Sequence, residues 1–71
     1  MNEASIQKEI AKNIKTARES KRLTQLEVAE KADLSVNHYA KIERGEVNPG
    51  LDTFILIVKA IGVKSSDILP L

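Results

Sequence analysis

Four residues between Ser35 and Gly45 combine short polar and apolar side chains on one side of a predicted helix. These outer residues are Val36, Asn37, Ala40 and Lys41. The helical period places a second, apolar set on the opposite side as an anchor. This inner set is Leu34, Tyr39 and Ile42. A helix that reads base edges needs one anchored face and one free face of this kind near its N-terminal end. The chemistry that these residues offer is therefore contact with the major groove of duplex DNA.

The segment Leu23–Gly45 must position that face, and it predicts two short helices joined by a tight turn. Thr24 and Glu27 have the spacing of a capping box, which starts the first of them. Asp33 falls in the turn, where a left-handed backbone is expected and Asp is tolerated. Ser35 is the expected cap of the second helix, and the glycine ends it in the left-handed conformation.

Three further helices are predicted around this pair. A helix over Glu3–Ser20 carries an apolar stripe, and Lys21–Leu23 connects it to the pair. The stripe consists of Ile6, Ile10, Ile14 and Ala17. A helix over Leu51–Ile61 follows an Asn-Pro-Gly turn and ends before Gly62. Its core-facing residues are predicted to be Leu51, Phe54, Ile55, Val58 and Ile61, broadened by Leu56 and Ile57. Ser65 or Ser66 is expected to cap a last short helix closed by Pro70. The fold class is all-α, with five helices in one domain over residues 1–71.

Composition limits the classes of function. The 71 residues suffice for one small domain with a marginal core, so a second subunit would help. Aromatic residues make up 3% of the chain, too few to stack single-stranded bases. The absence of cysteine excludes thiolate metal sites and favours a cytoplasmic location for the protein. No run approaches the roughly 20 apolar residues of a membrane span, and no signal peptide is visible. The net charge of +1 argues against a polycationic binder, so contacts to DNA need local charge, for which Lys21 and Arg22 are candidates.

The spaced pattern Leu-Thr-Gln-x-x-Val-Ala-x-x-Ala-Asp-Leu-Ser-x-x-x-Tyr-x-x-Ile-Glu-Arg-Gly-x-x-Asn-Pro resembles the lambda-repressor-like (Cro/cI, Xre) helix-turn-helix family. The resemblance extends from about Ile10 to Leu69. It departs at Asp33, where the family usually has Gly, and at Gly50, where it usually has a capping Ser. The resemblance implies a compact five-helix bundle with the helix-turn-helix in its second and third helices.

The resemblance also implies roles for individual residues. Val36, Asn37, Ala40 and Lys41 match base-reading positions. Asn37 suits adenine, and Lys41 suits guanine or a phosphate. The positions that match contacts to DNA phosphates are Thr24, Gln25, Arg44 and Asn48. The glutamine at the position of Gln25 can also brace a side chain of the recognition helix. Arg18 and Glu43 match a buried ion pair between the first and third helices. More ordinary interpretations remain: Gln25 as an exposed helix former, Asn37 in solvent, and Tyr39 in the core with its hydroxyl at the rim.

The leading functional interpretation is a sequence-specific transcription regulator that binds double-stranded DNA. One recognition helix reads too few base pairs for a genome, so we expect a homodimer. Its interface would lie at the fourth and fifth helices, on a pseudo-palindromic operator with half-sites roughly 34 Å apart. The sequence does not choose among a phage-type or chromosomal repressor, a restriction–modification controller and an antitoxin, in a prokaryotic cell or encoded by a phage. A controller is attractive because such proteins consist of little beyond this domain, whereas an antitoxin usually needs extra chain to wrap its toxin. We expect no cofactor, metal, membrane contact or small-molecule ligand.

The alternative is a protein-interaction module on the same fold, an antitoxin or an anti-repressor, that binds a partner regulator and binds DNA little. The near-neutral charge favours it weakly, whereas the polar outer face argues against it. An enzyme is not expected, because the sequence shows no nucleophile–base pair, no glycine-rich phosphate loop and no metal cluster.

Overall fold

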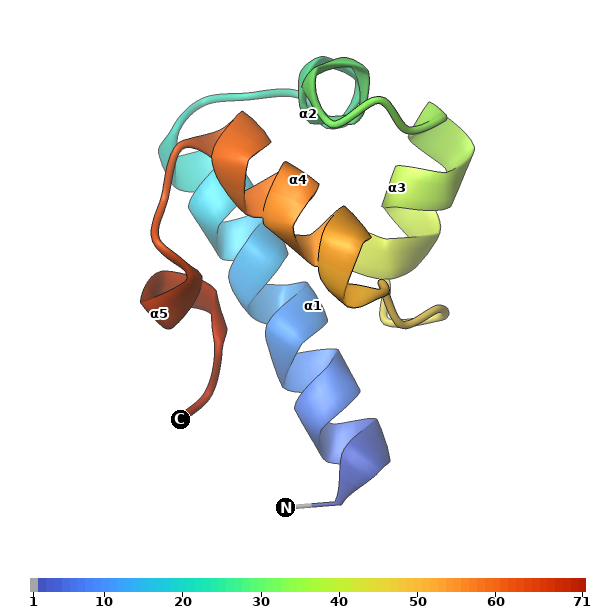
Figure 1. Ribbon diagram of the computed structural model, residues 1–71, viewed down its shortest axis with the longest axis vertical. Helices are drawn as coiled ribbons and strands as arrows, with labels where there is room; N and C mark the ends of the chain where they lie inside the picture. The colour runs from blue at the N-terminus through green and yellow to red at the C-terminus, as the bar shows by residue number, and fades with distance from the viewer. Residues whose placement is uncertain (1) are drawn as a thin grey trace.

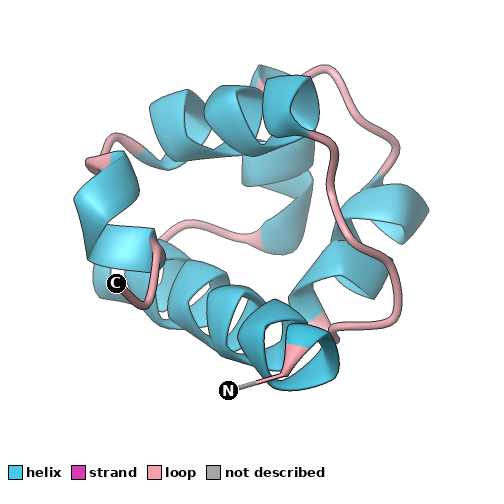
Figure 2. Ribbon diagram, turned by 60° about the horizontal axis from the view of Figure 1, so that its bottom comes forward, coloured by secondary structure: helices cyan, strands magenta, loops and turns pink. Residues whose placement is uncertain are grey.

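The computed structural model describes residues 2–71, and the regular structure over that range is entirely helical (Figures 1 and 2). The five helices are α1 (Glu3–Ser20), α2 (Gln25–Lys31), α3 (Val36–Glu43), α4 (Leu51–Ile61) and α5 (Ser65–Ile68). The predicted all-α fold with the helix-turn-helix at α2 and α3 is therefore confirmed, and α1 and α4 have the predicted bounds.

The helices pack around the long α1. It contacts α3, α4 and α5, while α2 packs against α3 and α4. In Figure 1, α3 and α5 lie on opposite sides of α1 and α4. The side chains between them are almost all aliphatic, as the scarcity of aromatic residues requires. The buried apolar residues are Ala11, Ile14, Val28, Ala29, Ala32, Tyr39, Ile42, Phe54, Ile57, Val58, Ile61 and Ile68.

Local hydrogen bonds fix the ends of α2 and α3. The Thr24 hydroxyl accepts from the Glu27 N–H at 3.0 Å, and the Glu27 carboxylate accepts from the Thr24 N–H at 2.9 Å. Ser35 caps α3 by accepting from the His38 N–H at 3.1 Å. Asp33 adopts the expected left-handed backbone, with φ of 58°. These bonds and this turn set the angle at which α3 leaves α2.

Two features of the predicted packing are wrong. Leu51 is 73% exposed, Ile55 is 43% exposed and Leu56 is 44% exposed, whereas Ile57 is fully buried. The face of α4 that meets the core is set by Phe54, Ile57, Val58 and Ile61. The sequence supplies more apolar side chains than that one face can bury. Ile6 is likewise 38% exposed rather than part of the core.

The cap predicted for α5 is also wrong. Lys64, and not a serine, is the N-cap residue, and Ser65 is the first residue of the helix. The Asp67 carboxylate accepts from the Lys64 N–H at 3.0 Å. A carboxylate three residues into the helix can satisfy this N–H whatever the side chain of the cap residue, so no serine is needed there.

Candidate nucleic-acid interface

The outer face of α3 is the candidate reading surface. Asn37 and Lys41 are exposed, Val36 is 38% exposed, and Ala40 is half-buried. On the opposite side, Tyr39 and Ile42 are buried. The structure thus brings the four predicted base-reading residues onto one accessible side of a helix whose other side is anchored in the core.

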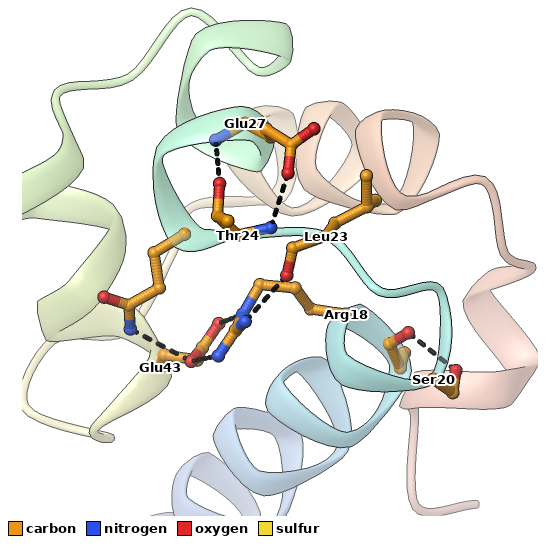
Figure 3. Close-up of polar contacts among 8 residues, drawn as sticks. Arg18, Ser20, Leu23, Thr24, Glu27 and Glu43 are labelled. Carbon is orange, nitrogen blue, oxygen red and sulfur yellow. Dashed lines mark hydrogen bonds and ion pairs between the residues drawn. The ribbon is translucent and has the colours of Figure 1, made fainter.

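An ion pair holds the end of α3 to α1 (Figure 3). The Arg18 Nε donates to Glu43 Oε2 at 2.7 Å, and its Nη2 donates to Oε1 at 2.9 Å. The Arg18 Nη1 also donates to the Leu23 carbonyl at 2.8 Å. The Glu43 side chain is 2% exposed. Burial raises the pKa of Glu43, but hydrogen bonds from Arg18 and Gln25 outweigh this effect and hold the pKa below its ordinary value.

Gln25 joins this network and so braces a side chain of the recognition helix, as the family resemblance implies, although Glu43 was not predicted as its partner. Its Nε2 donates to Glu43 Oε1 at 3.1 Å, although the two residues are 18 positions apart. The sequence offers no local signal for such a contact. Gln25 therefore connects the start of α2 to the end of α3, and a second proton on the same Nε2 remains for an outside acceptor.

Thr24 lies at the start of α2, where its backbone N–H and its side chain are both occupied in the capping box. Hydrogen bonds from Thr24 keep the pKa of Glu27 below its ordinary value. A DNA phosphate at the Thr24 N–H would have to displace the Glu27 carboxylate.

Arg44 and Asn48 lie in or next to the loop after α3. The Arg44 guanidinium pairs with the Glu46 carboxylate, and the two side chains are 54% and 52% exposed. Their hydrogen bond raises the pKa of Arg44 and lowers that of Glu46. Asn48 is exposed. The pairing with Glu46 was not predicted, and it means that a phosphate must compete with a carboxylate for Arg44.

The Tyr39 hydroxyl is buried and not at the rim as expected. The residue is fully buried, and its hydroxyl oxygen has no hydrogen-bond partner of normal geometry among residues 2–71. Burial, with the neighbouring Glu43 carboxylate, raises the pKa of Tyr39 far above its ordinary value. This hydroxyl therefore stays protonated and adds no charge to the network.

Replacing Tyr39 with phenylalanine is expected to leave the free energy of unfolding unchanged or to raise it by up to about 1 kcal/mol. The substitution removes a polar atom that is buried without a partner and keeps the ring that fills the core. Urea unfolding followed by circular dichroism measures the difference. A loss of more than about 1 kcal/mol would mean that the hydroxyl is bonded to Glu43 in solution.

Other kinds of site are not seen in the described range. No three metal-ligating side chains of the His, Cys, Asp and Glu types gather within residues 2–71. None of the helices described has both the length and the apolar character needed to cross a membrane.

Comparison with known proteins finds helix-turn-helix proteins of similar sequence. A helix-turn-helix family model matches residues 14–68. The chain is 41% identical over 59 residues to an immunity repressor protein of Bacillus phage phi105, covering 83% of the chain and 41% of that relative. It is 29% identical over 55 residues to an uncharacterised HTH-type transcriptional regulator of Sinorhizobium fredii, covering 78% of the chain and 28% of that relative. The chain thus spans less than half the length of either curated relative.

Two solved structures share the fold. The restriction–modification controller protein C.AhdI from Aeromonas hydrophila superposes with a TM-score of 0.87 at 18% identity, over 92% of this chain and 98% of that one. The clp gene regulator ClgR from C. glutamicum gives 0.85 at 21% identity, over 89% and 82%. At these identities the likeness concerns the fold.

Proposed function

Since the chain belongs to the Cro/cI-type helix-turn-helix family of DNA-binding transcription regulators, we propose that it reads a specific pseudo-palindromic operator as a homodimer. The observation that carries the proposal is the packing of α3. Tyr39 and Ile42 anchor one side of this helix in the core, and its other side exposes both polar and apolar residues. A helix held in this way enters the major groove with its first turns against the base edges.

The base contacts are assigned to that face. Asn37 pairs with adenine, Lys41 contacts guanine or a phosphate, and Val36 or Ala40 meets a thymine methyl. Asn37 and Lys41 are exposed in the structure, which supports the assignment. Asn37 lies in the first turn of α3, the part of a recognition helix that goes deepest into the groove.

The backbone contacts lie at both ends of the helix-turn-helix. Gln25 donates one amide proton to Glu43 and its other amide proton to a DNA phosphate. These two hydrogen bonds connect the DNA strand to the end of α3. Arg44 and Asn48 contact the backbone from the following loop, and Thr24 does so if Glu27 moves aside. Such contacts fix orientation and register without reading sequence.

The homodimer uses the outer side of α4, together with α5. Leu51, Ile55 and Leu56 leave 73%, 43% and 44% of their surface exposed on this one helix. Single exposed apolar residues are common, but several on one helix form a patch of the kind that subunits bury. A two-fold axis there would present two copies of α3 to successive major grooves.

Replacing Arg44 with alanine is expected to weaken binding to every duplex and to reduce the salt slope of log K by about one. Arg44 is a phosphate contact in this proposal, so its loss carries no base preference. Lys12→Ala is the matched control, since it removes one exposed positive charge from α1, outside the surfaces proposed for DNA and for the second subunit. The salt slope is obtained from DNA affinities of the wild type and both variants, measured across a series of salt concentrations. An unchanged slope would remove Arg44 from the phosphate contacts.

Selection of bound duplexes from a random pool at moderate salt tests the function as a whole. We expect a two-fold symmetric motif whose half-sites lie about one helical turn apart, or a multiple of that. Failure of the folded protein to enrich any sequence would contradict the proposal and favour a protein-interaction module on the same fold.

A further inference from the structure

The N-terminal half of α1 lies outside the family match and contacts the end of the recognition helix. The match starts at residue 14, whereas α1 starts at Glu3. Residues 3–13 therefore add about three helical turns to the matched region. The loop that follows α3 packs against these turns.

The contact centres on Gly45. The Gln7 Nε2 donates to the Gly45 carbonyl at 2.8 Å, across 38 positions of sequence. A Cβ placed on Gly45 would lie 3.6 Å from the Lys8 Cγ and 3.7 Å from the Ala11 Cβ, so α1 lies directly against this residue. Gly45 also has a left-handed backbone, with φ of 74°. The Gly45 carbonyl comes just after the last turn of α3, and its hydrogen-bond donor, Gln7, lies on α1.

Gly45 lies between Arg44 and Asn48, the two loop residues that contact the DNA backbone in the proposed function. Arg44 precedes it, Glu46 follows it, and the Glu46 N–H donates to the Lys41 carbonyl at 2.9 Å. Asn48 shares a shallow pocket of about 210 Å³ with Gln7 and the neighbouring residues of α1. The direction of the Gly45 carbonyl therefore sets how this loop leaves α3.

We propose that Gln7 is a positioning residue for DNA binding: its amide fixes the turn at Gly45 and thereby holds Arg44 and Asn48 at the phosphates. The inference rests on the proposed function. It assigns a role to a part of α1 that the family match does not include. Gln7 itself touches no DNA, so it acts equally on all sequences.

Asn13 supplies a matched control on the same helix. Its Nδ2 donates to the Ile68 carbonyl at 2.8 Å, so it also ties α1 to the end of another helix, which is α5. Gln7→Met and Asn13→Leu each remove an amide donor, keep the size of the side chain, add no charge and retain helix-forming residues. The two variants should lose similar stability, because each lacks one partly buried hydrogen bond.

The experiment compares DNA affinity across salt concentrations for the wild type and both variants, with each protein folded and dimeric by sedimentation. Gln7→Met is expected to bind every duplex about three- to tenfold more weakly, with a smaller salt slope. Asn13→Leu is expected to keep the wild-type affinity and slope. In the double variant Gln7→Met/Arg44→Ala, the loss should be smaller than the product of the single losses, because both act through one contact. Hydrogen exchange of the Glu46 N–H should speed up in Gln7→Met alone.

Three results would overturn the inference. If Gln7→Met keeps wild-type affinity and slope while Arg44→Ala does not, the inference fails and the proposed function stands. Equal losses of affinity in Gln7→Met and Asn13→Leu would show that binding weakens because the fold is less stable, and not because the turn at Gly45 has changed. If the wild type selects no duplex at all, the proposed function fails and the inference falls with it.

Discussion

Replacing Arg18 with methionine is expected to lower the free energy of unfolding by about 3–5 kcal/mol, because it leaves the Glu43 carboxylate buried without a cation. That side chain is 2% exposed, and two of its hydrogen bonds come from Arg18, at 2.7 and 2.9 Å. For 71 residues, the total free energy of unfolding is roughly 4–10 kcal/mol. The variant should therefore be largely unfolded, or close to it, in urea titrations followed by circular dichroism.

The double variant Arg18→Met/Glu43→Leu is the control for this interpretation. Removing both charges removes the uncompensated carboxylate, so much of the lost stability should return. Recovery should be incomplete, since the Leu23 carbonyl and the Gln25 amide each lose a partner. A loss below about 1 kcal/mol in Arg18→Met would show that water reaches Glu43 and that the pair is no more than a surface ion pair.

The same pair predicts how stability depends on pH. The pKa of Glu43 is lowered by folding below its ordinary value of 4.5, so the unfolded chain binds the proton more tightly. Its contribution is thus present above about pH 4.5 and is lost as the pH falls through the lower, folded-state pKa. The wild type should lose stability on acidification more steeply than the double variant. Glu27 and Glu46, whose pKa values are also lowered, are common to both proteins and cancel in the difference.

Features that depend on neighbouring residues were predictable from the sequence. The bounds of α1 and α4 and the capping box of Thr24 follow from side chains within a few positions. The left-handed turn at Asp33 follows from the spacing between two helices whose ends are marked by caps. The side of α3 that faces outward follows from the helical period, because Tyr39 and Ile42 are the large apolar residues available to anchor it.

Features that depend on distant residues were not predictable. The contact of Gln7 with Gly45 joins residues 38 positions apart, and glutamine occurs in many exposed helices. For Gln25, the family resemblance implied a contact to the recognition helix, but the partner, Glu43, lies 18 positions away and could not be named from local sequence. The exposure of Leu51 could not be foreseen either, because an apolar residue beside a core stripe looks the same whether it meets the core or a second subunit. Arg22 adopts a left-handed backbone, with φ of 57°, without the usual sequence signal of a glycine or an asparagine.

Replacing Asn37 with alanine is expected to cost about 1–3 kcal/mol of binding free energy on the selected operator and to relax the preference at one base position of each half-site. Asn37 is exposed in the first turn of α3, so its amide is available for two hydrogen bonds to an adenine. Those bonds are lost on the cognate base. On a duplex with another base at that position, the amide never forms both of them, so the wild type and the variant should bind alike.

A comparison across operator variants separates reading from positioning. Affinities of the wild type and Asn37→Ala are measured on the selected operator and on duplexes altered at each position in turn, with Thr16→Ala as a control. Thr16 is exposed and lines a shallow pocket with Val63 and Asp67, away from α3. If Asn37 reads a base, the two proteins differ on every altered duplex except the one changed at that base position in both half-sites, on which the difference disappears. An equal loss on all duplexes would instead make Asn37 a backbone contact, and sequence reading would then fall to Lys41 and Val36.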